Sequence, residues 1–325
     1  MREIPTREEL TMLQHLPLEI KILKTKQRIR EWVDEFGVDG VYISFSGGKD
    51  STVLLHLVRE LYPDIEAVFV DTGLEYPEIK EFVKTFDNVT ILRPKMSFKE
   101  VIEKFGYPVI SKEVSNTIAN ARYNIKTGTD SLRLRQLRGF EIDNNGNKSM
   151  FNKEKYLYLL DAPFKISDKC CYYMKKSPAH KFIKQTGKVA ITGQIADESR
   201  LRLTQWIKFG CNGFNMKQPI SNPLSFWTEQ DILQYIHQYN IKICSVYGEL
   251  VPYADENQLT FDKSIIKLKL TGCQRTGCMF CMFGVHLEKE PNRFQKMKIT
   301  HPKIYDYCIN NLGLGNVLDF IKVKY

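Results

Sequence analysis

Residues 46–52 combine the residue types of a phosphate-binding turn. Their sequence, SGGKDST, joins an apolar strand predicted at residues 41–45 to a helix predicted from Asp50. The two glycines let the backbone approach an anion, and the amides that follow lie at a helix N-terminus, where the helix dipole favours negative charge. Ser51 and Thr52 add hydroxyl donors. The pattern matches neither the Walker A nor the dinucleotide-binding glycine pattern, and an ordinary glycine-rich turn is the alternative.

A short acidic loop follows the next apolar strand, which is predicted at residues 65–70. The loop has the sequence DTGLEYP and places two carboxylates, those of Asp71 and Glu75, near one another. Carboxylate oxygens are hard ligands that suit Mg²⁺, which they could hold against bound phosphates. Capping of the next helix, predicted at residues 78–86, is the alternative.

A third polar segment, TGQIADESRLR at residues 192–202, follows a strand predicted at residues 189–192. Arg200 and Arg202 carry planar guanidinium groups, whose geometry matches the oxygens of phosphate or sulfate. Ligands of open parallel sheets bind at the carboxyl ends of the strands. We therefore expect these polar segments to bind an anionic ligand at one edge of a sheet.

Five cysteines form a second group of candidate ligands. Cys273, Cys278 and Cys281 lie in a glycine-rich loop, and the adjacent Cys170 and Cys171 precede them by about one hundred residues. Thiolates suit iron-sulfur clusters and zinc equally well on spacing alone. Five thiols thus compete for four ligand positions.

His286, five residues after Cys281, permits a different arrangement. A Cys3His zinc site would leave Cys170 and Cys171 for redox or persulfide chemistry. The remaining cysteines have no ligand spacing and are predicted to be small apolar core residues. These are Cys211, Cys244 and Cys308.

Alternating strands and helices must position these groups. Residues 89–92 are a further strand candidate, and helices are predicted at residues 16–36, 50–61, 78–86 and 228–239. Such alternation predicts an α/β, doubly wound, mostly parallel sheet with helices on both faces. The turn-rich segment at residues 139–156 is predicted to be a hairpin or a mobile loop.

The motifs resemble those of a known superfamily. SFSGGKDST at residues 44–52 resembles the PP-loop of the N-type ATP pyrophosphatases and of the phosphoadenosine phosphosulfate (PAPS) reductase family. Residues 71–75 and 192–202 resemble the second and third motifs of this family, and PISNPL at residues 219–224 extends the match over most of residues 41–240. The resemblance implies a Rossmann-like, adenine nucleotide alpha-hydrolase-like domain.

The resemblance also implies the residues that bind and react. Lys49 and Asp50 are the catalytic candidates of the PP-loop, and residues 71–75 line the adenine and ribose pocket. The expected ligand is ATP or a related adenylyl nucleotide with Mg²⁺. The implied nucleotide- and phosphate-binding residues are Ser44, Ser46, Gly47, Gly48, Lys49, Asp50, Ser51, Thr52, Asp71, Thr72, Gly73, Glu75, Gly193, Glu198, Arg200 and Arg202.

We predict three regions along the chain. Residues 1–38 are a helical lead-in, and residues 39–245 are the PP-loop, PAPS reductase-like domain that binds the adenine nucleotide. Residues 246–325 are a smaller C-terminal module with the cysteine cluster and helices.

The cysteine pattern resembles that of the iron-sulfur adenylylsulfate reductases, in which a Cys-Cys pair and a distant Cys-x2-Cys hold a [4Fe-4S] cluster. Cys170, Cys171, Cys278 and Cys281 fit this pattern, and Cys273 is an additional candidate. Zinc is the alternative metal. Without a cluster, Cys170 and Cys171 are catalytic candidates.

The expected reaction depends on a difference from the reductases. Thioredoxin-dependent members carry a nucleophilic cysteine in a Glu-Cys-Gly-x-His segment near the C-terminus, whereas this chain has CINNLG at residues 308–313 and VLDF at residues 317–320. Our first hypothesis is an ATP pyrophosphatase-type enzyme that adenylates an acceptor for sulfur transfer. The alternatives are a phosphoadenylylsulfate or adenylylsulfate reductase that produces sulfite, and a non-catalytic nucleotide- or nucleic-acid-binding module.

Positive charge is concentrated in the middle of the chain. The formal net charge is +9, and residues 111–217 hold 20 Lys and Arg against nine Asp and Glu. Nucleic acid is the partner and acceptor expected for such a region, as in relatives that thiolate tRNA or introduce phosphorothioates into DNA. A solvated basic surface is the alternative.

The sequence indicates a cytoplasmic location. No stretch has the ~18 uninterrupted apolar residues of a membrane span, and the charged N-terminal segment is unlike a secretory signal. In that compartment, the eight cysteines are expected to be metal ligands or thiols rather than disulfides. A sulfur donor protein such as a cysteine desulfurase and a homo-oligomer are compatible partners.

Overall fold

The computed structural model describes residues 5–253 and 267–325. Two compact units are present, and each combines separate parts of the chain. Of the described residues, 5–71, 75–92, 179–253 and 267–276 form the first unit, and 72–74, 93–178 and 277–325 form the second. The three regions expected from the sequence follow chain order and remain a prediction.

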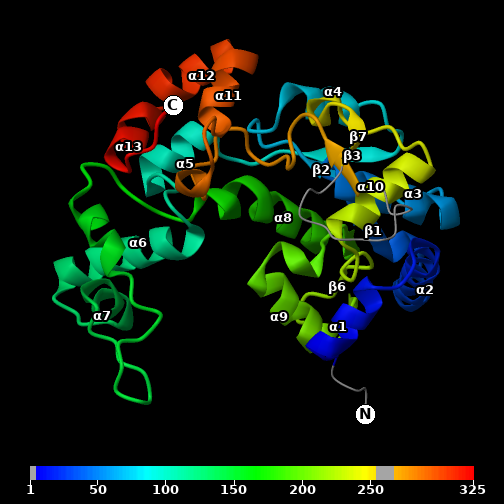
Figure 1. Cartoon of the computed structure of the whole chain (residues 1–325), viewed down its shortest axis with the longest axis horizontal. Coiled ribbons are helices and arrows are strands. Elements are labelled where there is room, and N and C mark those ends of the chain that lie inside the picture. The colour runs from blue at the N-terminus through cyan, green and yellow to red at the C-terminus, as the bar shows by residue number, and fades with distance from the viewer. Residues whose placement is uncertain (1–4, 254–266) are drawn as a thin grey trace. The chain divides into compact units, whose positions relative to one another are not determined.

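A six-stranded sheet with the strand order β3-β2-β1-β4-β6-β5 forms the centre of the first unit (Figure 1). Its strands are β1 (Val41–Ser44), β2 (Ala67–Val70), β3 (Val89–Leu92), β4 (Val189–Thr192), β5 (Asn212–Gly213) and β6 (Ile220–Ser221). All neighbouring pairs are parallel except β5 and β6. The predicted α/β, mostly parallel architecture is confirmed.

Helices and a strand pair complete the first unit. They are α1 (Arg7–Gln14), α2 (Leu18–Phe36), α3 (Lys49–Leu61), α4 (Pro77–Val83), α9 (Arg200–Phe209), α10 (Glu229–Gln238) and the antiparallel strands β7 (Leu250–Tyr253) and β8 (Lys267–Leu270). Helix α8 (Ser177–Thr186) begins in the second unit and ends in the first. The predicted helices before and after the phosphate-binding turn correspond to α2 and α3.

The two faces of β1 bury different side chains, as the alternation of a strand requires. Val41 and Ile43 belong to the main core cluster, which includes apolar residues of α2, α3 and α10. Tyr42 points to the opposite face and packs edge-on against Phe182, with ring centroids 5.2 Å apart. Burial raises the pKa of Tyr42 to about 12. Both faces of the sheet are therefore covered.

A buried ion pair joins α2 to the start of α10. Lys21, whose side chain is 2% exposed, donates from Nζ to Asp231 Oδ2 over 2.6 Å and to the Gln14 carbonyl oxygen over 2.6 Å. Asp231 also accepts from the backbone amide and the hydroxyl of Thr228 in a capping box. The pair thus fixes the N-terminus of α10, where Glu229 lies.

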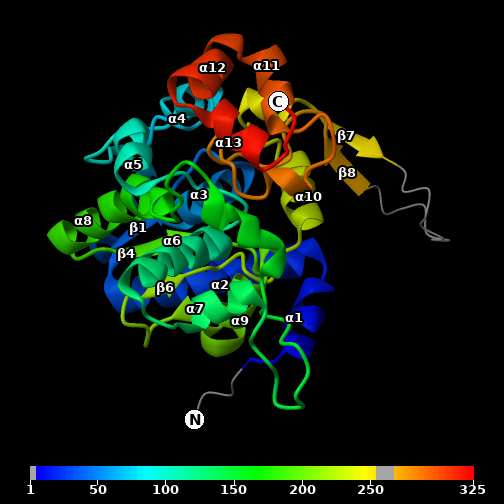
Figure 2. The same ribbon diagram turned by 90° about the vertical axis from the view of Figure 1, so that its left-hand side faces the viewer.

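The second unit consists mainly of helices, and its last helices follow one another as short segments (Figure 2). Its α-helices are α5 (Phe98–Phe105), α6 (Lys112–Thr127), α7 (Leu132–Arg138), α11 (Arg293–Thr300), α12 (Pro302–Asp306) and α13 (Leu314–Phe320). A π-helical turn at Tyr172–Lys176 leads into α8. Parallel bridges between Tyr107 and Ile166 and between Ile110 and Phe283 connect its loops.

Arg122 holds an irregular segment of the second unit. Its guanidinium donates to the carbonyl oxygens of Leu159, Ala162 and Phe164 at 2.9, 2.7 and 2.6 Å. The Leu159 carbonyl oxygen also accepts from the Ala162 amide at 3.4 Å, so Arg122 holds the end of the 3-10 helix Glu154–Asp161 and the residues that follow it. This arginine of the basic region therefore has a structural contact.

The segment predicted as a hairpin or a mobile loop contains one antiparallel bridge, between Ile142 and Lys148. Asp143 forms the turn by accepting from the amides of Asn145 and Asn147, both at 2.9 Å.

Within residues 5–253 and 267–325, no helix has the length and apolar character required to cross a bilayer.

The ion pair of Lys21 is expected to contribute strongly to stability. Lys21→Met should lower the free energy of unfolding by about 3 kcal/mol, because it leaves the Asp231 carboxylate buried without its counter-charge. Urea denaturation measures this change. Lys26→Met is the matched control, because Lys26 pairs with the more exposed Glu60; it should cost less than about 1 kcal/mol. Equal losses in both variants would contradict the prediction.

Candidate active site

The loop between β1 and α3 packs tightly against its neighbours. Gly47 has φ +70°, and a Cβ added there would lie 2.9 Å from Cγ2 of both Ile79 and Val83 in α4. A Cβ added at Gly193, after β4, would lie 2.9 Å from the carbonyl oxygen of Asp50. The glycines therefore let three backbone segments meet at the N-terminus of α3.

Hydroxyl groups stabilise the loop from inside. Ser51 and Thr52 donate to the Gly48 carbonyl oxygen at 2.9 and 3.0 Å. Ser51 Oγ also accepts from the Ser46 amide at 3.2 Å and lies 3.0 Å from Ser46 Oγ. These two hydroxyls, expected to donate to an anion, thus support the turn. Among the described residues, the amides of Asp50 and Ser51 in the first turn of α3 have no hydrogen-bond partner.

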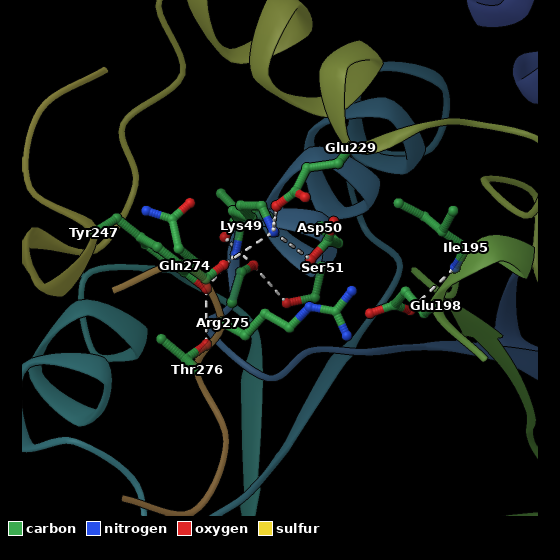
Figure 3. A network of polar contacts seen from close by, with 12 residues as sticks. Lys49, Asp50, Ser51, Ile195, Glu198, Glu229, Tyr247, Gln274, Arg275 and Thr276 are labelled. Carbon is green, nitrogen blue, oxygen red and sulfur yellow. Dashed lines mark hydrogen bonds and ion pairs between the residues drawn. The ribbon is translucent and has the colours of Figure 1, made fainter. Parts of the chain in front are cut away.

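The buried side chain of Lys49 lies in a polar network (Figure 3). Its side chain is 5% exposed, and its Nζ lies 3.3 Å from Glu229 Oε1 and 3.5 Å from Asp50 Oδ2. It also donates to the Gln274 carbonyl oxygen at 3.4 Å. These contacts are long enough to be exchanged for a closer anion, because strong charge-assisted hydrogen bonds are shorter, at about 2.7–2.9 Å.

Tyr247 adds a hydroxyl that the sequence analysis did not identify. The backbone amide of Lys49 donates to Tyr247 Oη at 2.9 Å, and this oxygen lies 2.7 Å from Thr276 Oγ1. Burial raises the pKa of Tyr247 to about 12, so the phenol stays neutral at physiological pH. A tyrosine in an apolar segment reads as a core residue, and no sequence signal separated it from the others.

Residues 273–276, which we call the strap, also belong to this site, and the sequence analysis did not predict this. A Cβ added at Gly48 would lie 3.1 Å from Thr276 Oγ1, so the strap lies directly on the loop. The polar residues Gln274, Arg275 and Thr276 stand between Gly272 and Gly277 in the sequence, and this was the available signal. Glu229 offered none, because it reads as a first-turn helix residue.

The third motif contributes an arginine to the same network. Arg202 forms an ion pair with Glu198, and the charge of Asp50 acts on its pKa. Burial, and then the charge of Arg275, lower the pKa of Arg202, whereas Asp50 raises it. Arg200, by contrast, is exposed. The structure therefore brings Arg202 to the phosphate loop and leaves Arg200 at the surface.

The acidic loop is divided between the two units. Asp71, at the end of β2, pairs with Lys80 at 2.9 Å and belongs with Glu75 to the first unit. Thr72 and Gly73 belong to the second unit, where Thr72 Oγ1 accepts from the Leu74 amide at 3.2 Å. Ser44, which was predicted to bind the nucleotide, is the last residue of β1 and is exposed.

Four of the five clustered cysteines lie together in the second unit. Cys170 and Cys171 precede the π-helical turn, and Cys278 and Cys281 lie in the loop after the strap. Burial raises the pKa of the Cys170 thiol, and the charges of Cys278, Cys171 and Cys281 raise it further. Their mutual effect shows that the tertiary structure brings two distant cysteine pairs close to one another.

Local contacts position the loop of Cys278 and Cys281. The Cys281 amide donates to the Cys278 carbonyl oxygen at 3.2 Å, and Arg293 donates to the Cys281 carbonyl oxygen at 2.9 Å. Burial raises the pKa of Cys281, whereas the charges of Arg293 and Lys175 lower it. Lys175 also lowers the pKa of Cys170. Both cations favour thiolates in this group.

Cys273 and His286 are placed differently. Cys273 belongs to the first unit, where its thiol lies 2.9 Å from the Arg275 carbonyl oxygen. His286 has its Nδ1 buried without a hydrogen-bond partner among the described residues, and burial lowers its pKa. In the described part of the chain, no group of three or more Cys, His, Asp or Glu side chains is placed to hold a metal ion.

The prediction that Cys211, Cys244 and Cys308 are core residues is confirmed for two of the three. Cys244 and Cys308 are buried at 1% and 0% exposure, as expected for core residues. Cys211 is partly buried as a residue, but burial still raises the pKa of its thiol. No disulfide joins any of the eight cysteines, all of which lie in the described ranges.

The central strand β1 leads through the SGGKDST loop into α3, within a mostly parallel α/β sheet. The profile of the phosphoadenosine phosphosulfate reductase domain matches residues 40–139 and 132–283. The chain belongs to this family, as its motifs indicated.

Two proteins with similar sequences are named for two different activities. A phosphoadenosine 5'-phosphosulfate reductase of Xylella fastidiosa is 35% identical over 85 residues, which are 26% of this chain and 35% of that protein. The match thus spans about a third of the reductase. A sulfate adenylyltransferase subunit 2 of Shewanella oneidensis is 25% identical over 311 residues, or 87% of this chain and 86% of that protein.

A solved structure with a similar chain is the phosphoadenylyl-sulfate reductase of Candida auris in a phosphate complex. It has 17% sequence identity and a TM-score of 0.39. The alignment covers 74% of this chain and 90% of the Candida auris chain.

Gly47→Ala should disturb the phosphate loop. The new Cβ would clash with α4 in a left-handed backbone conformation, so we expect a loss of about 2–4 kcal/mol in unfolding free energy. Urea denaturation measures it. Gly128→Ala is the control, since Gly128 has φ +67° but nothing within 4 Å of an added Cβ; it should cost about 1 kcal/mol. Similar losses for both variants would refute the role of close packing at Gly47.

Proposed function

We propose that this chain binds ATP, or a related adenylyl nucleotide, and adenylates an acceptor for sulfur transfer. The observation that carries the proposal is the grouping of Lys49, Arg202 and two unpartnered amides of α3 at the phosphate loop. Such donors stabilise a departing anion when they are positioned before the reaction. The relative aligned over most of the chain is named for adenylyl transfer, which favours this reaction.

The chain's residues have distinct roles in this reaction. The amides of Asp50 and Ser51 and the Lys49 ammonium group bind the pyrophosphate part of ATP. An acceptor oxygen then forms a bond to the α-phosphorus, and the bond from that phosphorus to the pyrophosphate oxygen breaks. Lys49 and Arg202 stabilise the charge on the pyrophosphate as it leaves.

A sulfur nucleophile completes the transfer. The acceptor forms a bond to sulfur, and the bond from the acceptor to the AMP oxygen breaks, so AMP leaves with the bonding electrons. With a persulfide from a cysteine desulfurase as the sulfur donor, the outer sulfur bonds to the acceptor. A second thiol then breaks the S–S bond and forms a disulfide with the donor thiol, which leaves the sulfur on the acceptor. Mg²⁺ would be held by carboxylates at the strand ends, those of Asp71 and Glu75, beside the phosphates.

The cysteine group fits a [4Fe-4S] cluster by its donor set. Cys170, Cys171, Cys278 and Cys281 supply four thiols in one unit. Lys175 favours the ionised forms of Cys170 and Cys281, and Arg293 favours that of Cys281. When bound, such a cluster supplies sulfide or electrons. Zinc is the alternative occupant. Cys273, in the other unit and bonded within the strap, is the least suited of the five predicted ligands.

Partners follow from the charge distribution and the relatives. The basic residues between 111 and 217 favour nucleic acid as the acceptor, although Arg122 is occupied with backbone carbonyls. The relative aligned over most of the chain is named as a subunit, which makes assembly with a second protein a further proposal.

A sulfonucleotide reductase is the second candidate function, because a relative with a local match is named as one. The two functions give different products. Release of pyrophosphate from ATP supports adenylyl transfer, and release of sulfite from PAPS or adenylylsulfate with a dithiol supports reduction.

Lys49→Ala should lower the rate of pyrophosphate release by about 100-fold or more, because a charge that stabilises the leaving group is lost. A coupled pyrophosphate assay measures this rate. Asp50→Ala should reduce it as well. Lys269→Ala is the control, because Lys269 is an exposed residue of β8 that contacts the Tyr253 ring. A Lys49→Ala variant with the rate of the control would refute this role.

Cys278→Ser should remove bound metal. Protein purified without oxygen should contain about four iron and four sulfide per chain if one [4Fe-4S] cluster is bound, and the variant should lose both. Iron, zinc and acid-labile sulfide analysis with the visible absorption spectrum checks this. Cys244→Ser is the control, because Cys244 is a core residue of the first unit. Unchanged metal content in Cys278→Ser would exclude Cys278 as an essential ligand.

A further inference from the structure

Arg275 is a charged residue of the strap for which neither the motifs nor the proposed reaction gives a role. Its neighbours are both anchored at the phosphate loop. The Gln274 carbonyl oxygen accepts from Lys49 Nζ at 3.4 Å, and Thr276 Oγ1 lies 2.7 Å from Tyr247 Oη, which binds the Lys49 amide. The backbone of Arg275 is therefore held beside the loop on both sides.

The guanidinium of Arg275 is directed along the loop toward the third motif. Figure 3 shows the Arg275 side chain extending from the strap past Ser51 toward Glu198. Its charge is the second cause, after burial, that lowers the pKa of Arg202. Glu198 is the ion-pair partner of Arg202, so the guanidinium groups of Arg275 and Arg202 are both directed to the third motif beside the loop.

The carboxylates of the network are engaged elsewhere. Glu198 pairs with Arg202, and Glu229 and Asp50 lie nearest to Lys49. Among the described residues, Arg275 has no ion pair or side-chain hydrogen bond, and it is exposed. A positively charged fork without a counter-ion, held at a loop with unpartnered amides, fits an anion with several oxygens.

We propose that Arg275 binds the phosphates of the nucleotide and acts with Arg202 as a guanidinium pair on the pyrophosphate part. The inference rests on the proposed function, because it assumes a polyphosphate at the loop. The proposal also names the phosphates of the nucleotide as the ligand of the strap. Two adjacent phosphates match the separate cations better than one, so pyrophosphate should bind more tightly than inorganic phosphate.

Binding of inorganic pyrophosphate tests the proposal, measured by calorimetry at fixed ionic strength on the full chain. Arg275→Ala should weaken binding by about 10- to 100-fold, which is the range for hydrogen bonds to charged groups. Arg275→Lys should fall between this variant and the wild type, because an ammonium group keeps the charge but not the fork. Arg30→Ala, which removes an exposed arginine of α2, should bind like the wild type.

Trypsin gives a second readout that does not need a variant. Arg275 is exposed, so trypsin should cut the wild-type chain after it, and pyrophosphate should slow this cut relative to cuts elsewhere. Equal pyrophosphate affinity in Arg275→Ala and Arg30→Ala, or unchanged cleavage, would overturn the role of Arg275 alone. A wild-type chain that binds neither pyrophosphate nor ATP would overturn the proposed function and this inference together.

Discussion

The close approach of backbone segments at the N-terminus of α3 is the constraint on which the candidate site depends. Gly47 is within contact of α4, Gly48 of the strap, and Gly193 of the Asp50 carbonyl. A side chain at any of these positions would separate the segments. Among the described residues, the amides of Asp50 and Ser51 at the start of α3 have no partner, and the hydroxyls of Ser51 and Thr52 close the turn.

Buried charge then determines how the helices around this loop are arranged. The pair between Lys21 and Asp231 fixes the start of α10, and this brings Glu229 within 3.3 Å of Lys49. Lys49 is shared among Glu229, Asp50 and a strap carbonyl at distances above 3.2 Å. A buried cation with several long contacts is stabilised without a ligand and still has a geometry that a phosphate can improve.

The cysteine group shows the same dependence on tertiary packing in the second unit. Burial alone would keep Cys170 protonated, and the nearby thiols strengthen this effect. Lys175 and Arg293 act in the opposite direction on Cys281. Opposing effects therefore act on Cys170 and Cys281, because burial and the neighbouring thiols favour the protonated forms and the nearby cations favour the thiolates.

The sequence by itself determined the elements and motifs with a strong local signal. The strands at residues 89–92 and 189–192 have the predicted bounds, and the turn at residues 46–52 links β1 to α3, because apolar runs and glycines act over a few residues. Tertiary structure alone decided that Arg202 reaches the loop while Arg200 stays exposed, and that Tyr247, Glu229 and the strap complete the network. Cys273 belongs to the first unit, and the four other clustered cysteines belong to the second. The physical reason is that these contacts join residues about 180 to 230 positions apart, and their side chains carry no local pattern that distinguishes them from ordinary core or surface residues.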